Sequence, residues 1–229
     1  MRSLRILVVV LVAAALAGAL GALLLVGGSS GAARSPMSSR FARLMSLSDA
    51  TGHAAPSFTL TDQHGVQESL GLFRGSVVIL EFMDPHCTDI CPIVAAEFER
   101  AAKDLGSAAA KVDFVAVNVN RYANSVQAIA QFSREQGLDK LRNWYFLTGS
   151  PSVLAKVWAE YGIAVISRGP TADVIHSSYI FFIDPAGRER YIASPTDLHT
   201  SAGTAYLPLA TQLRWGRGIA SYARELLGR

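Results

Sequence analysis

The stretch Val77–Pro92 reads VVILEFMDPHCTDICP and combines an apolar run with two closely spaced cysteines. The run at its start is almost wholly apolar, which is typical of a strand buried on both faces of a sheet. After the cysteines, the segment from Pro92 to Leu105 places its apolar residues on one helical stripe. Proline suits the first position of a helix, because its missing N–H costs nothing there. The stretch therefore predicts a buried strand, a cysteine loop and a helix, in that order.

Strand and helix patterns alternate along the rest of the chain. The predicted strands are Ser57–Thr61, Val112–Val119, Trp144–Leu147, Ser178–Ile183 and Glu189–Ala193, and the predicted helices are Ala123–Gln136, Pro151–Tyr161 and Ile219–Leu227. Three helix-breaking residues, Pro208, Gly216 and Gly218, interrupt the pattern before the last helix. This order, with a β-hairpin near its end, indicates an α/β fold in which helices flank a central sheet.

An uncharged apolar segment, Ile6–Val26, follows Arg2 and Arg5 at the N-terminal end. As a helix it is about 31 Å long, close to the hydrocarbon thickness of a bilayer. We therefore expect an N-terminal transmembrane helix that anchors the protein. A cleaved signal peptide is the alternative, with small residues at 28–33 as its cleavage site. Both interpretations place the following domain on the extracytoplasmic side of the membrane.

Composition divides the chain into four parts. We expect a membrane anchor or signal segment at 1–28, a linker at 29–55, a globular domain at 56–193 and a C-terminal extension at 194–229. The linker is rich in Ser, Gly and Ala, and part of it, Arg40–Leu47, is compatible with a short helix. The formal charge of +3 is exceeded by the arginines of the N-terminal end alone. A nearly neutral remainder without a Lys/Arg-rich run argues against nucleic-acid binding.

Cys87 and Cys91 are the only cysteines of the chain, so no disulfide framework is present. Unpaired N–H groups and the helix dipole at a helix N-terminus favour the thiolate that both a nucleophile and a metal ligand require. Three residues separate the cysteines, whereas redox pairs of the thioredoxin kind usually have two between them. This spacing is compatible with metal binding and with disulfide formation, and it does not separate the two.

The order of strand, H-C-x-D-x-C-P motif and helix resembles the Sco/SenC family, copper-binding proteins of thioredoxin fold that help to assemble the copper centre of cytochrome oxidase. Further similar segments extend over residues 56–193: Phe58-Thr59-Leu60 with Asp62 and Gly65, Leu147-Thr148-Gly149, Ala159-Glu160-Tyr161-Gly162, His176-Ser177, and Tyr179–Gly187. The resemblance implies a thioredoxin-like sheet and a copper ion held by Cys87, Cys91 and His176. Two thiolates and an imidazole suit Cu(I) especially, although Zn(II) accepts the same ligands.

The function that the resemblance implies is that of a copper metallochaperone and not of an enzyme. Such a protein would bind copper outside the membrane and deliver it to a cuproprotein, such as an oxidase subunit. The alternative is a thiol–disulfide oxidoreductase that acts on the cysteines of a copper-site partner. That role needs Cys87 and Cys91, which would then be catalytic, but it does not need His176. A redox or copper sensor is a third interpretation.

The chain departs from the family pattern near the expected site. Asp84-Pro85 stands where F-T or Y-T is common, and Thr88 stands where proline is usual after the first cysteine. The family's V-D-P-x-R-D segment resembles 117–122, which keeps Arg121 but has neither aspartate. These changes are compatible with copper binding and leave the oxidase partner open. Three further residues are candidates for orienting or tuning the ligands: Asp84, His86 and Asp89.

Overall fold

The computed structural model describes residues 41–194 and 214–228. Its strands are β1 (Ser48–Asp49), β2 (Thr59–Thr61), β3 (Gln67–Ser69), β4 (Val77–Met83), β5 (Val112–Asn118), β6 (Trp144–Leu147), β7 (Val165–Ser167), β8 (Val174–His176), β9 (Ile180–Ile183) and β10 (Glu189–Ala193). Its helices are α3 (Ile90–Leu105), α4 (Val126–Glu135), α5 (Pro151–Glu160) and α7 (Arg214–Leu227), with 3₁₀ turns η1 (Leu70–Phe73), η2 (Gly106–Lys111) and η3 (Leu138–Lys140).

The expected membrane segment, Ile6–Val26, lies outside the described residues. Within 41–194 and 214–228, no helix combines the length and the apolar character that crossing a bilayer requires.

The central sheet has six strands in the order β1-β10-β9-β4-β5-β6. Strands β4, β5 and β6 run parallel, whereas β9 pairs antiparallel with both β4 and β10. Every residue of β4 is buried, as the apolar run in the sequence predicts for a strand in the middle of a covered sheet. The sheet therefore confirms the predicted α/β architecture.

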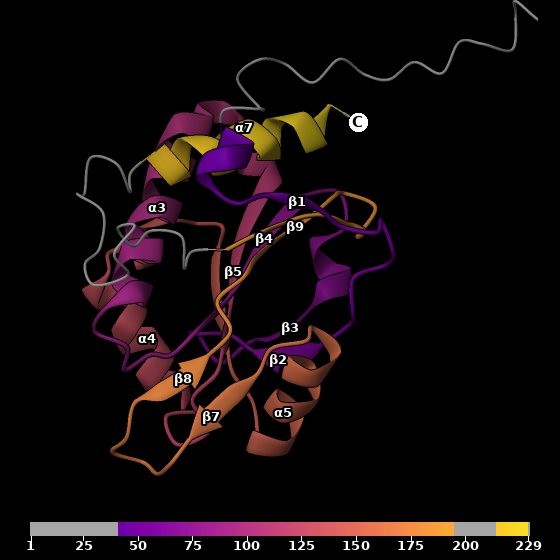
Figure 1. Cartoon of the computed structure of the whole chain (residues 1–229). Coiled ribbons are helices and arrows are strands. Elements are labelled where there is room, and N and C mark those ends of the chain that lie inside the picture. The colour runs from indigo at the N-terminus through magenta and orange to yellow at the C-terminus, as the bar shows by residue number, and fades with distance from the viewer. Residues whose placement is uncertain (1–40, 195–213, 229) are drawn as a thin grey trace, which may run out of the picture. The chain divides into compact units, whose positions relative to one another are not determined.

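Alternate residues of β4 belong to two separate cores, one on each face of the sheet. Val77 and Ile79 pack in the core that α3, α4 and α7 complete, whereas Val78 and Leu80 pack in the core completed by α5, η1 and the β2–β3 hairpin. Figure 1 shows α3 and α7 stacked at one end, with α5 and the β7–β8 hairpin toward the other. The cysteine loop leaves the sheet where β4 ends.

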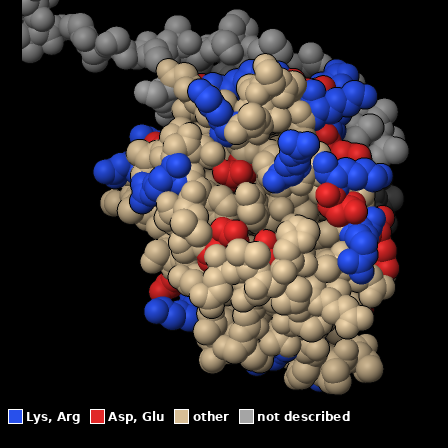
Figure 2. Space-filling model, turned by 180° about the vertical axis from the view of Figure 1, so that it is seen from behind, with Lys and Arg blue, Asp and Glu red and all other residues tan. Residues whose placement is uncertain are grey.

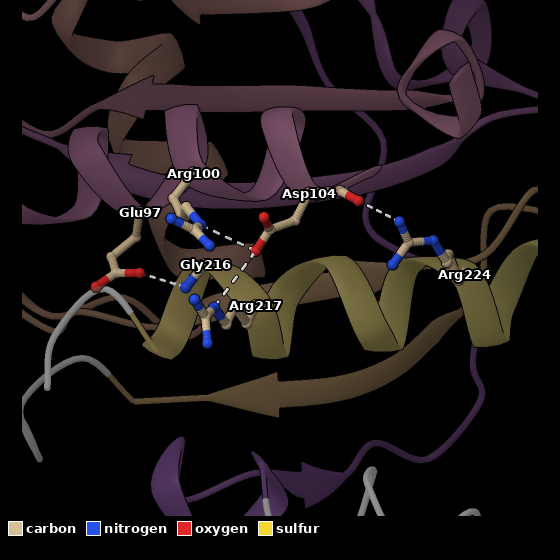
Figure 3. Close-up of polar contacts among 6 residues, drawn as sticks. All are labelled: Glu97, Arg100, Asp104, Gly216, Arg217 and Arg224. Carbon is tan, nitrogen blue, oxygen red and sulfur yellow. Dashed lines mark hydrogen bonds and ion pairs between the residues drawn. The ribbon is translucent and has the colours of Figure 1, made fainter. Parts of the chain in front are cut away.

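Helix α7 begins earlier than the sequence predicts, at Arg214 in place of Ile219. The glycines that were expected to break it lie inside it, because they allow a close approach to its neighbours. A Cβ at Gly216 would lie 2.7 Å from the carbonyl oxygen of Glu97 on α3, and a Cβ at Gly218 would meet the side chain of Met45. Figure 3 shows α7 lying along α3. Close packing of the helices thus outweighs the roughly 1 kcal/mol cost of glycine in a helix.

The folded domain extends into the segment that was expected to be a linker. Strand β1 pairs with β10 at the edge of the sheet, and the side chain of Met45 is fully buried. Residues 41–44 form a helical turn within the predicted short helix. A strand of two polar residues has no alternating pattern, so β1 could not be predicted from the sequence.

Charge is unevenly distributed over the surface. Figure 2 shows Lys and Arg gathered mainly over the end of the molecule that carries α3 and α7, and mostly uncharged residues over the opposite end. Exposed apolar side chains at that opposite end include Val153 on α5, Ile166 on β7 and Ile175 on β8. Ile166 and Ile175 are direct partners across the β7–β8 hairpin.

Candidate metal and thiol site

Local hydrogen bonds shape the cysteine loop between β4 and α3. The Asp84 carboxylate accepts a hydrogen bond from the His86 amide at 2.8 Å, and the Cys87 amide donates to the Asp84 carbonyl at 3.1 Å. Asp89 caps α3, since its carboxylate accepts from the Ile90 amide. The helix therefore begins at Ile90, before the predicted start at Pro92, and Cys91 lies in its first turn.

The two cysteines are free thiols that contact each other. The Cys91 amide donates a hydrogen bond to Cys87 Sγ at 3.2 Å, and the Cys87 thiol donates to Asp89 Oδ1 at 3.0 Å. A hydrogen bond from the Cys91 thiol lowers the pKa of Cys87. The same bond, together with burial, raises the pKa of Cys91 well above its usual value. The pair thus has a partly exposed sulfur that ionises readily and a buried one that keeps its proton.

His176 ends strand β8, and its ring is oriented by its own backbone. Nδ1 lies 2.9 Å from the Ser177 carbonyl oxygen. A carbonyl only accepts, so Nδ1 carries the proton and Nε2 keeps a lone pair. Burial lowers the pKa of His176, which leaves the imidazole neutral at pH 7. A neutral ring with one nitrogen held by a carbonyl is typical of a metal ligand.

Cys87 and His176 line the same cavity, which has a volume of about 600 Å³ and lies between the cysteine loop and the β7–β8 hairpin. Asp84 and Asp89 line it too, whereas the buried Cys91 does not. Within the described ranges, no three His, Cys, Asp or Glu side chains gather closely enough to hold a metal ion. The structure therefore brings the two sulfurs together and places the imidazole on the same cavity without joining it to them. The three-residue ligand set stays a prediction.

Cys87 also lines a second cavity of about 610 Å³, formed with α4. His86 and Thr88 line both cavities, so the centre of the cysteine loop separates the two hollows. Cys87 therefore contributes to the walls of both cavities.

Two contacts near the site involve residues that the sequence did not single out. Asn120 donates from Nδ2 to Asp84 Oδ1 at 3.0 Å, and Ser178 Oγ donates to Glu81 Oε1 at 3.0 Å. Glu81 gave one available signal, since it is the only charged residue in the apolar run of β4. Asn120 gave none, because its partner depends on how β5 and the cysteine loop meet.

The SCO1/SenC family model matches residues 48–205. A curated relative, the SCO1 protein homolog of Bacillus subtilis (strain 168), is 25% identical over 144 residues, which are 62% of this chain and 74% of the relative.

Among solved structures, Bradyrhizobium japonicum ScoI with copper bound is 19% identical, with a TM-score of 0.59 over 76% of this chain and 99% of that one. Apo Sco1 from Thermus thermophilus is 20% identical, with a TM-score of 0.60 over 78% and 95%. A SCO1/SenC family lipoprotein from Bacillus anthracis str. Ames is 22% identical, with a TM-score of 0.57 over 74% and 96%.

At these identities the solved structures establish the fold, and the predicted thioredoxin-like sheet is confirmed. The family model spans more than half of the sequence and includes the cysteine loop and His176. The chain therefore belongs to the SCO1/SenC family.

Proposed function

We propose that the protein is a copper metallochaperone, which binds copper through Cys87, Cys91 and His176 and passes it to a cuproprotein such as an oxidase subunit. The observation that carries the proposal is a cavity lined by Cys87, whose sulfur contacts the buried thiol of Cys91, and by the neutral imidazole of His176. Soft thiolates select Cu(I), and imidazole completes a three-coordinate set. Copper is the cargo in this proposal. The similar structure of Bradyrhizobium japonicum ScoI contains bound copper, which supports it.

Copper binding by this set requires His176 to approach the sulfurs. The ring nitrogen that would bind, Nε2, has no hydrogen-bond partner in the described part of the chain, and the β7–β8 hairpin that carries it is a separate two-stranded sheet. A shift of that hairpin closes the cavity without disturbing the central sheet. The same movement in reverse opens the site for ligand exchange with a partner, in which incoming ligands replace those of the chaperone one at a time.

The test is Cu(I) binding by the reduced full-length chain in competition with a chromophoric chelator. We expect one copper per chain, and loss of that copper in Cys87→Ser and Cys91→Ser. His176→Ala should weaken binding by at least tenfold, whereas the matched control His53→Ala, an exposed histidine outside the cavity, should leave it unchanged. A stoichiometry near zero in the reduced wild type would refute the proposal.

The unequal cysteines favour a second candidate function, that of a thiol–disulfide oxidoreductase. A nucleophilic sulfur with a lowered pKa beside a buried, protonated partner suits attack by Cys87 and resolution by Cys91. In that reaction the Cys87 thiolate attacks a disulfide of the partner, which forms a mixed disulfide and releases one partner thiolate. Cys91 then loses its proton and attacks Cys87 Sγ, so that a Cys87–Cys91 disulfide forms and the second partner thiolate leaves.

The two functions separate at His176. The rate at which the reduced chain reduces a disulfide-linked peptide should survive His176→Ala and vanish in Cys87→Ser if the protein is a reductase. A chaperone should lose copper retention in the same His176→Ala variant.

We further propose that the domain is anchored on the extracytoplasmic side of a membrane by Ile6–Val26. The apolar length of this segment supports it, and the similar protein from Bacillus anthracis is a lipoprotein. The chain should stay in the membrane pellet after alkaline extraction and become soluble when residues 1–28 are deleted. A full-length chain found in the supernatant would contradict the anchor.

A further inference from the structure

The backbone pairing between β4 and β9 ends before it reaches the site. The register pairs Val78 with Ile183 and ends with Leu80 opposite Phe181. Strand β4 continues beyond this point to Met83, and the chain that carries His176 enters β9 from the same end. In the described residues, the ladder of these two strands therefore does not extend to the histidine segment.

A side-chain hydrogen bond joins the two segments where the ladder stops. Ser178 Oγ donates to Glu81 Oε1 at 3.0 Å, and both residues are buried, at 7% and 1% exposure. Glu81 lies on the strand that leads to Cys87, and Ser178 follows His176 by two positions. One hydrogen bond thus connects the strand behind the cysteines to the segment that presents the imidazole.

The other hydrogen bonds near His176 hold the hairpin to itself. The Ser177 amide donates to the Ala164 carbonyl at 3.0 Å, and the Ala164 amide donates to Ser177 Oγ at 3.2 Å. Ala164 directly precedes β7 and Ser177 directly follows β8, so these bonds join the two ends of the hairpin to each other. The bond from Ser178 to Glu81 differs from these, because it is a side-chain hydrogen bond that ties this segment to the central sheet.

A carboxyl group at position 81 destabilises the fold relative to an apolar side chain. Its neighbours on β4 are all apolar, and its second oxygen, Oε2, is buried with no hydrogen-bond partner among the described residues. Burial raises the pKa of Glu81 well above its usual value, because the charged form loses its hydration there. An apolar residue of similar size would avoid the unsatisfied oxygen and would fit the strand pattern. That a destabilising carboxyl stands here is consistent with a role of Glu81 in function.

We propose that Glu81, acting through Ser178, is a positioning residue that holds His176 where the imidazole can reach the cysteine sulfurs. This inference rests on the copper function proposed above and names the residues that set its third ligand. Partners that orient a ligating histidine typically contribute 10–100-fold to metal affinity. The bond fixes the chain two residues beyond His176, so the hairpin can close over the cavity about this point and bring the imidazole to the sulfurs in one register.

The first test is Cu(I) affinity of the full-length chain by chelator competition. Ser178→Ala and Glu81→Leu should each weaken binding about tenfold or more. Glu81→Gln keeps a carbonyl that accepts from Ser178 and should bind as the wild type does. The matched controls are Ser133→Ala and Glu97→Gln, which alter a buried serine and a buried glutamate bonded elsewhere, and both should bind as the wild type does.

Two further measurements separate positioning from a merely structural role. The double variant Glu81→Leu/Ser178→Ala should bind no more weakly than the weaker single variant, because both changes break one bond. The melting temperature of Glu81→Leu should be equal to or above that of the wild type, while its copper affinity falls. Copper affinity that is unchanged in Ser178→Ala, in a protein that loses affinity in His176→Ala, would overturn the proposal.

The role of Glu81 and Ser178 in placing His176 can be tested even if the protein does not bind copper. If the wild type binds no copper, the NMR signals of the His176 ring in the metal-free full-length chain report its placement. They should shift or broaden in Ser178→Ala and Glu81→Leu and stay unchanged in Glu81→Gln and Glu97→Gln. Ring signals that are the same in all four variants would overturn the positioning role independently of copper.

Discussion

The backbone amide of Cys91 donates a hydrogen bond to Cys87 Sγ over 3.2 Å. This contact exists because α3 begins at Ile90, which leaves the amides of its first turn without partners inside the helix. Cys91 lies in the first turn of α3, and its free amide binds the sulfur of Cys87, which lies just before the helix. The hydrogen bond from the Cys91 thiol lowers the pKa of Cys87 most, and this amide contact adds to it, whereas the pKa of Cys91 is raised.

Removal of the Cys91 thiol should make Cys87 less reactive. A hydrogen bond from that thiol is the main cause of the lowered pKa of Cys87, so Cys91→Ala should raise that pKa and slow alkylation by iodoacetamide at pH 7. Mass spectrometry of the reduced full-length chain measures the rate at each cysteine. In the wild type Cys87 should react first, and in Cys87→Ala the buried Cys91 should react slowly. Equal rates at the two cysteines would contradict the asymmetry.

Replacement of Asp89 by asparagine should have the opposite effect on Cys87. The Asp89 carboxylate accepts a hydrogen bond from the Cys87 thiol, and this bond raises the pKa of Cys87. Asp89→Asn removes the negative charge but keeps a good N-cap, so the stability should change by about 0.5 kcal/mol or less. Alkylation of Cys87 should become faster at pH 7, with Thr88→Ala as the control on the same loop. A slower reaction in Asp89→Asn would show that the carboxylate assists ionisation.

Sequence patterns predicted the fold best where strands are apolar and long. Strands β6 and β10 have the predicted bounds, and β4 begins with the apolar run at Val77 that predicted a buried strand. The errors lie where packing decides the structure. Strand β1 is polar and has two residues, and the start of α7 depends on glycines that fit against α3 and Met45. Neither feature has a local signal.

The parts of the site that lie close together in the sequence could be predicted. The cysteine motif predicted two sulfurs at a helix start, which the structure confirms with the helix shifted to Ile90. His176 required the family resemblance, and its approach to the sulfurs stays a prediction. Glu81 and Asn120 escaped notice because each acts through a partner distant in sequence, 97 and 36 residues away. Only the folded sheet brings those pairs together.

The buried contact between Asn120 and Asp84 predicts that an acidic residue at position 120 is not tolerated. The Asn120 amide donates to Asp84 Oδ1 at 3.0 Å, and Asn120→Asp would place two carboxylates there. We expect a loss of about 1–3 kcal/mol in the free energy of unfolding at pH 8. One carboxyl of the pair would have a raised pKa in the folded state, so the loss should shrink at pH 5. Urea unfolding measures both values.

The control for this substitution is Asn120→Ala, which removes the hydrogen bond without adding a charge. Its destabilisation should be nearly the same at pH 5 and pH 8. If Asn120→Asp were equally stable at both values, the two carboxylates would not be in contact, and Asp84 would have to turn away from the loop.

The interface between α3 and α7 has its own polar contacts (Figure 3). Glu97 Oε2 accepts a hydrogen bond from the Gly216 amide at the start of α7. Asp104 forms ion pairs with Arg100 at 3.0 Å and with Arg217 at 3.9 Å, and Arg224 bonds to its carbonyl. The Glu97 contact is buried, whereas the arginines are partly exposed, so Glu97 is the group whose protonation matters most for stability.

Burial raises the pKa of Glu97 from 4.5 to about 8. Between these values the folded chain holds a proton that the unfolded chain releases, so this contribution to stability is complete below the lower value and is lost as the pH rises through the upper one. Glu97→Gln stays neutral and still accepts from Gly216. Its free energy of unfolding relative to the wild type should therefore increase from pH 5 to pH 9, by about 1.4 kcal/mol for each unit of pKa difference at most. Guanidinium unfolding of both chains across this range measures the difference, with the exposed Glu99→Gln on the same helix as control. Parallel stability curves for Glu97→Gln and the wild type would show that the carboxyl ionises as readily in the folded chain as in the unfolded one, and that α7 docks on α3 without a protonated Glu97.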